Sequence, residues 1–555
     1  MSKGSFYFAL FSWSILLSAP LYAQIEFVLE KNKKFDSHID ITHFKNKSEL
    51  AIDVTLPNIQ LYPFEKNANF VELGHEQLQL LQNPGEPKVP FVATLVNAYP
   101  EDLEVDIVSA KSKVLKNSLI APAQKEPCRC ESDIVEKFIF HKNAYKQQNN
   151  LVNLEYLGKY RGIPITRILV KLAKSDYKKN FSKIYSKVLV KIQSKQRLNS
   201  PTLNIIEKKG LDYLVVGPPE LTIGLSLWKT RKEALGFTFK VVNIDGADAL
   251  DNKLLDTIFK TEYKKNKFQY ALLVGDVTKL GTNLVTTQWS TQTQSDYQFF
   301  LMDGKRDIIP DVQYGRVVAS TVDDVVYQAN KWINYELEQT LLNRGLSSMI
   351  GIASNEGANP SDDEYVRSIE TMLENSYGTR IQHFHQDDLR SNPVEINAAF
   401  KQGAHWLTYM GHGSGKSWGS TNKLYDTTHI KDLKNFKKAQ PILIDVACQN
   451  GRLNQGYFGE RMVNEGPKKN YFWRDNNIIG AALYYGGSVN ISWHPPAIMA
   501  KGMVEEQIKQ NLHRVGDIIL AGHLYLMNNY SDLNAVKENF AWYHLFGDPS
   551  TKVNF

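Results

Sequence analysis

A change in hydrophobic periodicity near residue 210 constrains the fold of this chain more than any other feature of its sequence. Beyond it, continuous apolar runs alternate with longer segments of helical period. Strands buried on both faces and separated by helices indicate a mostly parallel, doubly wound α/β sheet. The expected strands are Tyr213–Val216, Tyr270–Val274, Met349–Ala353, Trp406–Met410, Ile442–Ile444 and Ile478–Ala482, and the expected helices are 320–340, 362–375 and 497–511.

The first 200 residues have a different pattern, in which short segments alternate polar and apolar positions. Turn residues such as those at 83–87 separate these segments. Period-two alternation bounded by Gly and Pro predicts an antiparallel, all-β domain. The clearest strands are expected at Ile52–Leu56, Phe91–Val96, Leu103–Val108 and Val188–Ile192.

A basic, polar stretch at about 193–210 joins the two parts and is interpreted as a linker. The window 171–210 holds eleven Lys or Arg residues and two acids, although the whole chain carries a net charge of only +6. Two interpretations stay open: a solvated basic face, or a processing region that a trypsin-like or self-acting peptidase cuts. So weak an overall charge gives no argument for a nucleic-acid partner.

The N-terminus has the pattern of a secretory signal peptide. A charged start at Lys3 precedes an apolar run from Phe6 to Leu17, and small residues follow up to Ala23. The run is shorter than the roughly twenty residues that a transmembrane helix needs. We expect cleavage after Ala23 and a secreted or periplasmic protein without a transmembrane segment once the signal is removed; an uncleaved anchor is the alternative.

The chain has only three cysteines, at positions 128, 130 and 448, which excludes a scaffold built on disulfides. An odd count leaves at least one thiol without an intramolecular partner. Cys128 and Cys130 flank Arg129, and three roles stay open for them: ligating a metal with help from elsewhere, forming a bridge, or bonding another chain.

Three residues with side chains suited to catalysis each follow a predicted buried strand. His412 lies between two glycines after Trp406–Met410, Cys448 follows the strand that begins at Ile442, and Glu356 follows Met349–Ala353. A cysteine nucleophile acts as the thiolate, and a nearby histidine lowers its pKa and moves protons. The amides of Gly413 and Cys448 are candidates to stabilise an oxyanion, and Glu356 to orient the imidazole.

The same residues carry a resemblance to a known family. Tyr409–Ser414 and Asp445–Gly451 resemble the His and Cys boxes of the gingipain family, in the caspase-like clan of cysteine peptidases. Further likenesses follow in the family's order, at Asp212–Val216, Leu272–Asp276, Ser295–Tyr297, Pro310–Arg316, Ile333–Glu336, Ala353–Gly357 and Phe546–Ser550, and Tyr156–Pro164 with Val188–Ile192 resembles the family's β-rich propeptide.

This resemblance implies a fold and a domain order. The catalytic domain would be a caspase-like α/β domain with doubly wound, mostly parallel sheets and two subdomains, at 206–345 and 346–555. An all-β propeptide-like domain with the basic linker would precede it at 24–205, after a signal peptide at 1–23. Cys448 would be the nucleophile, His412 the general base and acid, and Glu356 the residue behind His412.

The resemblance also implies a pocket and a metal. Asp362 or Asp363 would line a pocket for a basic substrate side chain, with Trp493 as its aromatic wall; helix N-capping by either acid, and core packing of Trp493, are the alternatives. The chemistry requires no cofactor. Gingipain-like domains bind structural calcium, and Asp276, Asp303 and Asp307 are the candidate ligands, although isolated loop acids are usually just solvated.

The resulting hypothesis is an exported cysteine endopeptidase, made as a proenzyme, that cleaves proteins or peptides after Arg or Lys and binds its own prodomain. The alternatives are a type IX secretion sorting peptidase that transfers its substrates, and a catalytically silent gingipain-fold binding protein. A metal-binding role for some of the 13 histidines lacks ligand-type spacing.

Overall fold

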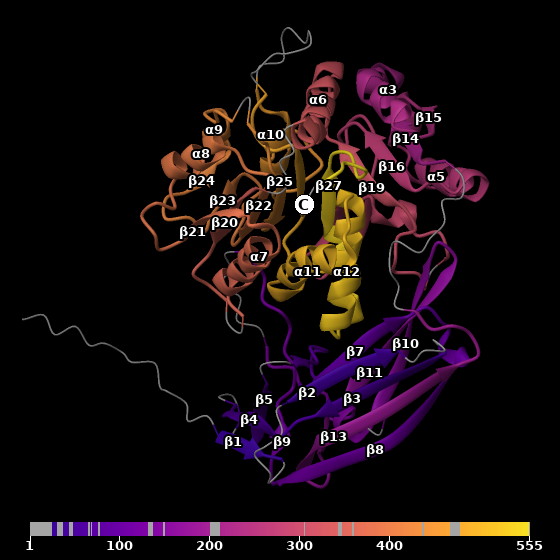
Figure 1. Cartoon of the computed structure of the whole chain (residues 1–555), viewed down its shortest axis with the longest axis vertical. Coiled ribbons are helices and arrows are strands. Elements are labelled where there is room, and N and C mark those ends of the chain that lie inside the picture. Colours follow the sequence, from indigo (N-terminus) through magenta and orange to yellow (C-terminus); the bar gives the residue numbers. More distant parts are fainter. Residues whose placement is uncertain are drawn as a thin grey trace, which may run out of the picture.

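The structure is a computed structural model of the whole chain, with an all-β N-terminal domain below a large α/β domain (Figure 1). It describes residues 25–29, 37–43, 48–64, 67, 69–75, 78–130, 137–147, 150–199, 211–304, 306–341, 347–357, 360–435, 438–466 and 478–553. The predicted signal peptide and the end of the predicted linker, 200–210, lie outside these residues. Within them, no helix is long and apolar enough to cross a membrane.

In its described residues, the N-terminal domain contains three sheets of four, four and five strands. The long strand β13 pairs with both β3 and β8 in antiparallel register, and one apolar core cluster lies between the layers. The strands are β1 (Ile25–Val28), β2 (His38–His43), β3 (Glu49–Thr55), β4 (Asn58–Pro63), β5 (Phe70–Gly74), β6 (Gln79–Leu80), β7 (Pro90–Val96), β8 (Leu103–Lys116), β9 (Leu119–Ile120), β10 (Val152–Tyr160), β11 (Ile163–Lys171), β12 (Ala173–Asp176) and β13 (Phe181–Ser194), and a short helix α1 (Ala144–Gln147) precedes β10.

The C-terminal domain is built on one continuous sheet of ten strands. All its neighbours pair in parallel except β26 and β27, so the two halves of the sheet run in opposite directions. In spatial order the strands are β15 (Phe239–Asn243), β14 (Tyr213–Gly217), β16 (Tyr270–Val274), β19 (Gln313–Val317), β27 (Tyr543–Phe546), β26 (Leu483–Gly487), β25 (Ile442–Val446), β22 (Trp406–Met410), β20 (Ser348–Ala353) and β21 (Arg380–His385).

Helices cover both faces of this sheet, because successive residues of its strands enter different cores. In β22, Trp406 and Met410 join the cluster that includes α7, α11 and α12, whereas Leu407 and Tyr409 join the cluster of α8 and α10. The helices are α2 (Pro219–Thr222), α3 (Ser226–Ala234), α4 (Gly246–Leu250), α5 (Asn252–Asn266), α6 (Val322–Leu341), α7 (Asp362–Tyr377), α8 (Pro393–Gln402), α9 (Thr427–Ile430), α10 (Phe458–Asn464), α11 (His494–Gln510), α12 (Val515–Asn529) and α13 (Leu533–Trp542); the hairpins are β17 (Asn283–Thr287) with β18 (Ser290–Ser295) and β23 (Ser417–Trp418) with β24 (Tyr425–Asp426).

The period-based predictions of helices and buried strands are confirmed, with one exception. The strand expected at Ile478–Ala482 is wrong, since β26 begins at Leu483 and runs through Tyr484 and Tyr485 to Gly487. Tyrosine and glycine interrupt the apolar run there, so the sequence pattern points to the less polar segment just before it. All five residues of β26 are nevertheless buried.

The two domains meet at α12, directly above β7 and β11 (Figure 1). Arg167 of β11 is fully buried and donates hydrogen bonds to the carbonyl oxygens of Met527, Tyr530 and Ser531, each at 2.8 Å. These carbonyls lie at and just beyond the last turn of α12, where unpaired acceptors and the negative end of the helix dipole favour a cation. The guanidinium therefore anchors the N-terminal domain to a helix of the other domain.

Candidate active site

The three strand ends singled out from the sequence are neighbours in space. β22 pairs with β25 on one side and with β20 on the other, and Met410 is opposite both Val446 and Ala353. Carboxyl ends of parallel strands meet at one edge of a sheet, which is where ligands bind in α/β domains. The structure thus brings His412, Cys448 and Glu356 to one edge.

The His412 ring lies between two oxygen acceptors. Its Nε2 is 3.0 Å and 3.1 Å from the two carboxylate oxygens of Glu356, and its Nδ1 is 2.7 Å from the carbonyl oxygen of Arg129. Both contacts are hydrogen bonds when the ring carries a proton on each nitrogen. The contact with the Glu356 carboxylate fixes the orientation of the ring.

The glycine after the histidine is required by the packing of the two loops. A Cβ atom on Gly413 would lie 2.5 Å from the carbonyl oxygen of Cys448 and 2.9 Å from its amide nitrogen. Only glycine permits so close an approach of two backbones. The amides of Gly413 and Cys448, the predicted oxyanion donors, consequently lie on adjacent stretches of chain.

The Cys448 thiol is completely buried. The amide of Ile491 donates to its Sγ at 3.4 Å. Burial raises the pKa of the thiol to about 12, and this amide and the positive charge of Arg129 only partly oppose the rise. Because the thiolate is the nucleophilic form, Cys448 in this arrangement is mostly the thiol and can attack only once its proton has been transferred.

Asp445 is a buried carboxylate beneath both loops that sequence reasoning missed. It accepts hydrogen bonds from Trp418 Nε1 at 3.2 Å, Asn450 Nδ2 at 3.1 Å and Tyr484 Oη at 2.6 Å. Trp418 follows His412 in the chain and Asn450 follows Cys448, so one side chain ties the two loops to each other and to β26. Burial raises the pKa of Asp445 to about 6.

A buried pocket next to these loops encloses the side chain of Arg129. Its guanidinium forms a two-pronged ion pair with Asp362, at 2.8 Å and 2.7 Å, and both side chains are fully buried. Nε donates to the Trp493 carbonyl oxygen at 2.9 Å, and the guanidinium carbon lies 4.5 Å from the centre of the indole ring. Ser354 Oγ donates to Asp362 at 2.7 Å and completes the pocket.

The segment carrying Arg129 pairs with the catalytic domain through an isolated antiparallel β-bridge. The Arg129 amide donates to the Ile491 carbonyl oxygen at 2.9 Å, and the Trp493 amide donates to that of Pro127 at 3.0 Å. Cys128 forms an antiparallel bridge with Ser492 between them. The N-terminal domain therefore extends one of its own segments across the edge of the sheet that carries His412 and Cys448.

The structure separates the two neighbouring acids predicted for the pocket. Asp363 lies outside it and pairs with Arg367 Nε at 2.7 Å and His383 Nε2 at 2.9 Å. Of the two acids, Asp362 is therefore the one that lines the pocket. Helix N-capping, the alternative for both acids, is instead performed by Ser361.

The predicted calcium ligands are regrouped in a similar way. Asp303 and Asp307 lie together with Asp311, and an oxygen of each is within 4.8 Å of the others. Asp276 is not in this group and accepts hydrogen bonds from Thr278. Burial and the neighbouring acids raise the pKa of Asp311 to about 8, and burial raises that of Asp307 to about 6. When ionised, these three side chains offer the carboxylate oxygens that calcium prefers as ligands.

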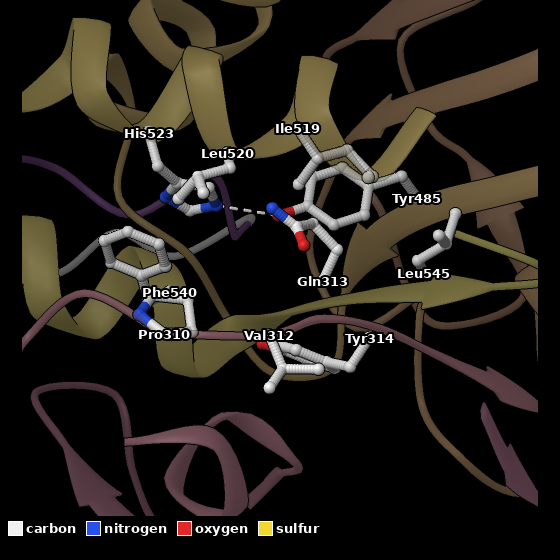
Figure 2. Close-up of a pocket in the computed structure, with 11 residues that line it drawn as sticks. Pro310, Val312, Gln313, Tyr314, Tyr485, Ile519, Leu520, His523, Phe540 and Leu545 are labelled. Atoms are coloured by element: carbon white, nitrogen blue, oxygen red, sulfur yellow. Dashed lines mark hydrogen bonds between the residues drawn. The ribbon is translucent and has the colours of Figure 1, made fainter. Parts of the chain in front are cut away.

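A cavity elsewhere in the domain has a different character (Figure 2). Apolar residues from α12, α13 and the middle of the sheet line it, and Tyr485 Oη is 2.8 Å from His523 Nε2. Burial lowers the pKa of His523 to about 3, so the imidazole is neutral. Its lining includes none of His412, Cys448 or Asp362, and we interpret it as a gap in core packing.

The family assignment rests on a match to known sequences that covers more than half of the chain. Residues 206–554 match the sequence model of peptidase family C25. The chain belongs to this family. Gingipain R2 of Porphyromonas gingivalis is 24% identical to this peptidase over 524 residues, which are 85% of this chain and 68% of the relative. Gingipain R1 of the same organism is 24% identical over 523 residues, and this chain covers only 50% of its length.

Solved structures agree with this assignment. The Arg-specific cysteine proteinase gingipain R matches this C25 peptidase with a TM-score of 0.55 at 24% identity, over 63% of this chain and 80% of that one. The complex of pro- and mature domains of a P. gingivalis gingipain matches with a TM-score of 0.54 at 25% identity, over 62% of this chain and 79% of that one. The predicted cysteine-peptidase class and the α/β fold with an all-β N-terminal region are confirmed.

Proposed function

We propose that this C25 peptidase is an exported endopeptidase that cleaves after Arg and is made as a latent proenzyme. The observation that carries the proposal is the buried pocket around Arg129, where Asp362 supplies the charge and Trp493 the stacking surface. In this proposal the Arg129 side chain stands in for the substrate residue before the scissile bond. Residues 126–130 then act as an inhibitor in the place of a substrate.

Selection of Arg over Lys follows from the shape of the contacts. The two oxygens of Asp362 accept two parallel N–H bonds, and a third N–H reaches the Trp493 carbonyl. An ammonium group has no planar fork to match this arrangement and stacks less well on an indole. Lys substrates should still be accepted, because their ammonium charge meets the carboxylate, but more weakly than Arg substrates.

Apart from one water molecule, the proposed reaction uses only side chains and amides of the chain. With the inhibitory segment displaced, Cys448 gives its proton to His412 and attacks the Arg carbonyl carbon, while the amides of Gly413 and Cys448 stabilise the oxyanion. His412, oriented by Glu356, returns the proton to the leaving amine. A water molecule, deprotonated by His412, then hydrolyses the thioester and releases the new carboxylate.

Two further parts of the proposal concern a metal and the location. Asp303, Asp307 and Asp311 would hold a structural calcium ion whose charge relieves the repulsion of buried carboxylates. Calcium would stabilise this loop region and take no part in the chemistry. The signal-like N-terminus supports export to the periplasm or beyond.

The test is a peptide-library cleavage assay on the full chain carrying Arg129→Ala. This change empties the pocket without altering the residues that line it. We expect cleavage after Arg, weaker cleavage after Lys, and none when Cys448→Ala is added. A folded Arg129→Ala variant that cleaves nothing would refute the peptidase function, and equal rates for Arg and Lys would refute the specificity argument.

A further inference from the structure

The residue in the pocket lies inside a small covalent ring. Cys128 and Cys130 form a disulfide across Arg129, with a sequence separation of 2 and their Cα atoms 5.1 Å apart. Of the three roles that the sequence left open for these cysteines, the structure shows the bridge. The backbone on both sides of the Arg129 carbonyl therefore belongs to one ring closed by the disulfide.

A bridge this short gives little to the stability of the N-terminal domain. The stabilisation that a disulfide provides by restricting the unfolded chain grows with the loop that it closes. The wider loop is already held at its base, where the Gln124 side chain exchanges hydrogen bonds with the backbone of Ile139 at 3.0 Å and 2.9 Å. The disulfide adds a constraint at the tip, where the segment meets the active site.

The carbonyl group of the peptide bond within the ring lies against the candidate catalytic histidine. A β-bridge and two backbone hydrogen bonds hold residues 127–129 on Ile491–Trp493, and His412 Nδ1 contacts the carbonyl oxygen of that bond. On the other side of the bond, the Cys130 amide donates to Cys128 Sγ at 3.1 Å. Attack by Cys448 at this carbonyl would expel the Cys130 amine, which the disulfide keeps tied to the acyl side.

We propose that the Cys128–Cys130 disulfide is a redox latch, which keeps Arg129 an uncleaved inhibitor until a thiol reductant opens the ring and lets the enzyme cut after Arg129. This inference rests on the proposed function and adds its regulation. In the oxidised chain, attack by Cys448 gives a thioester and a tethered amine. The amine attacks the thioester, which restores the peptide bond and the Cys448 thiol.

Reduction changes the competition between the amine and water. Two equivalents of a small thiol reduce the disulfide to two cysteine thiols and are themselves oxidised to their disulfide. The Cys130 amine is then no longer tied to the acyl side by the small ring, so its effective concentration at the thioester falls below that of an oriented intramolecular amine. Water hydrolyses the thioester, leaving a carboxylate at Arg129 and regenerating Cys448.

The test follows self-cleavage of the full chain by intact mass, since hydrolysis adds one water even where the disulfide still joins the fragments. Wild type and a Cys128→Ser/Cys130→Ser variant are purified without reductant, and each is then incubated with and without dithiothreitol. We expect the variant to be cut after Arg129 without reductant, at least about a hundredfold faster than the oxidised wild type. Dithiothreitol should bring the wild type to the variant's rate.

Two controls separate the possible causes. Cys448→Ala added to the double serine variant should abolish cutting, which identifies self-processing. In the double variant Cys448 is the remaining cysteine, so any dithiothreitol dependence that persists belongs to the nucleophile. A Cys128→Ala/Cys130→Ala variant and thermal melts guard against a misfolded serine variant.

The outcomes also distinguish this inference from the function on which it rests. Equal rates for oxidised wild type and both double variants, with an Arg129→Ala chain that still cleaves Arg peptides, would overturn the latch alone. A folded Arg129→Ala chain without activity on any peptide would overturn the proposed function itself. Cleavage of the oxidised wild type at the rate of the reduced chain would also overturn the latch.

Discussion

Asp362→Asn offers the sharpest test of the pocket, because it removes a charge and keeps the shape. Asp362 and Arg129 are both fully buried, and their two hydrogen bonds are 2.7 Å and 2.8 Å long. Removing one partner of a buried ion pair costs about 3–5 kcal/mol, because the other charge stays desolvated. At 1.36 kcal/mol per tenfold, kcat/KM for Arg substrates should fall roughly 150- to 5,000-fold.

The assay compares two peptides that differ only in the residue before the scissile bond, Arg in one and its neutral isostere citrulline in the other. Measured in the Arg129→Ala background, the Arg-to-citrulline ratio of kcat/KM should be large with Asp362 and should collapse with Asn. Asp363→Asn is the matched control. Its partner Arg367 is half exposed, so loss of that pair is worth about 0.3–0.5 kcal/mol and less than about threefold in rate.

The result that would refute this reasoning is an unchanged Arg-to-citrulline ratio in a folded Asp362→Asn variant. An equal loss in Asp362→Asn and Asp363→Asn would also refute it, because it would point to a general effect on α7. The ratio is the decisive quantity, since a disturbed helix lowers both rates and leaves their ratio intact.

Three further predictions concern groups whose pKa the fold shifts. Burial raises the pKa of Asp445 from 3.8 to about 6, so its favourable contribution, complete below pH 3.8, is lost as the pH rises through 6; Asp445→Asn should remove this part of the pH dependence in denaturant titrations. The pKa values of Asp307 and Asp311 are also raised, to about 6 and about 8, so both carboxyl groups are ionised and able to bind calcium at pH 8.5 but not at pH 5. Calcium should therefore raise the melting temperature more at pH 8.5 than at pH 5, and Asp311→Asn should abolish that gain. Because burial raises the pKa of Cys448 to about 12, iodoacetamide should label the latent chain slowly at pH 8, and Arg129→Ala should speed labelling at least about tenfold; equal labelling rates would contradict the burial argument.

Periodicity revealed most of the α/β framework, because buried parallel strands are locally distinctive. Runs such as Trp406–Met410 can be recognised as buried strands from their apolar composition alone. The pairing that joins the two halves of the sheet could not be predicted from the sequence in this way. β27 comes from the end of the chain and inserts between β19 and β26, and such a pairing depends on contacts between distant segments that no local pattern encodes.

The residues of the candidate site likewise fall into those that local sequence patterns could predict and those that depend on distant segments. His412, Cys448 and Glu356 follow strands that could be recognised, so their convergence could be anticipated. Arg129 could not, because its role depends on a segment of another domain reaching the site. Cys128 and Cys130, which flank Arg129, were the feature of the sequence that could have drawn attention to this position.

The other missed residues were hidden for a related reason. Asp445 and Asp311 both lie within segments that carried the family resemblance, but their sequence context does not reveal burial. Asp445 is the last residue but one of β25 and faces a network of three donors. Asp311 joins its cluster through a loop whose path only the folded chain determines.

The bond between Arg129 and Asp362 has a consequence for how such a peptidase can diverge. If one carboxylate both holds the inhibitory segment and selects the substrate, then preference and restraint cannot be altered separately. A lineage that acquired a new pocket without a matching change at position 129 would then lose the contact that holds the enzyme latent. Redirecting this enzyme to another target sequence would therefore require rewriting its inhibitor in the same step.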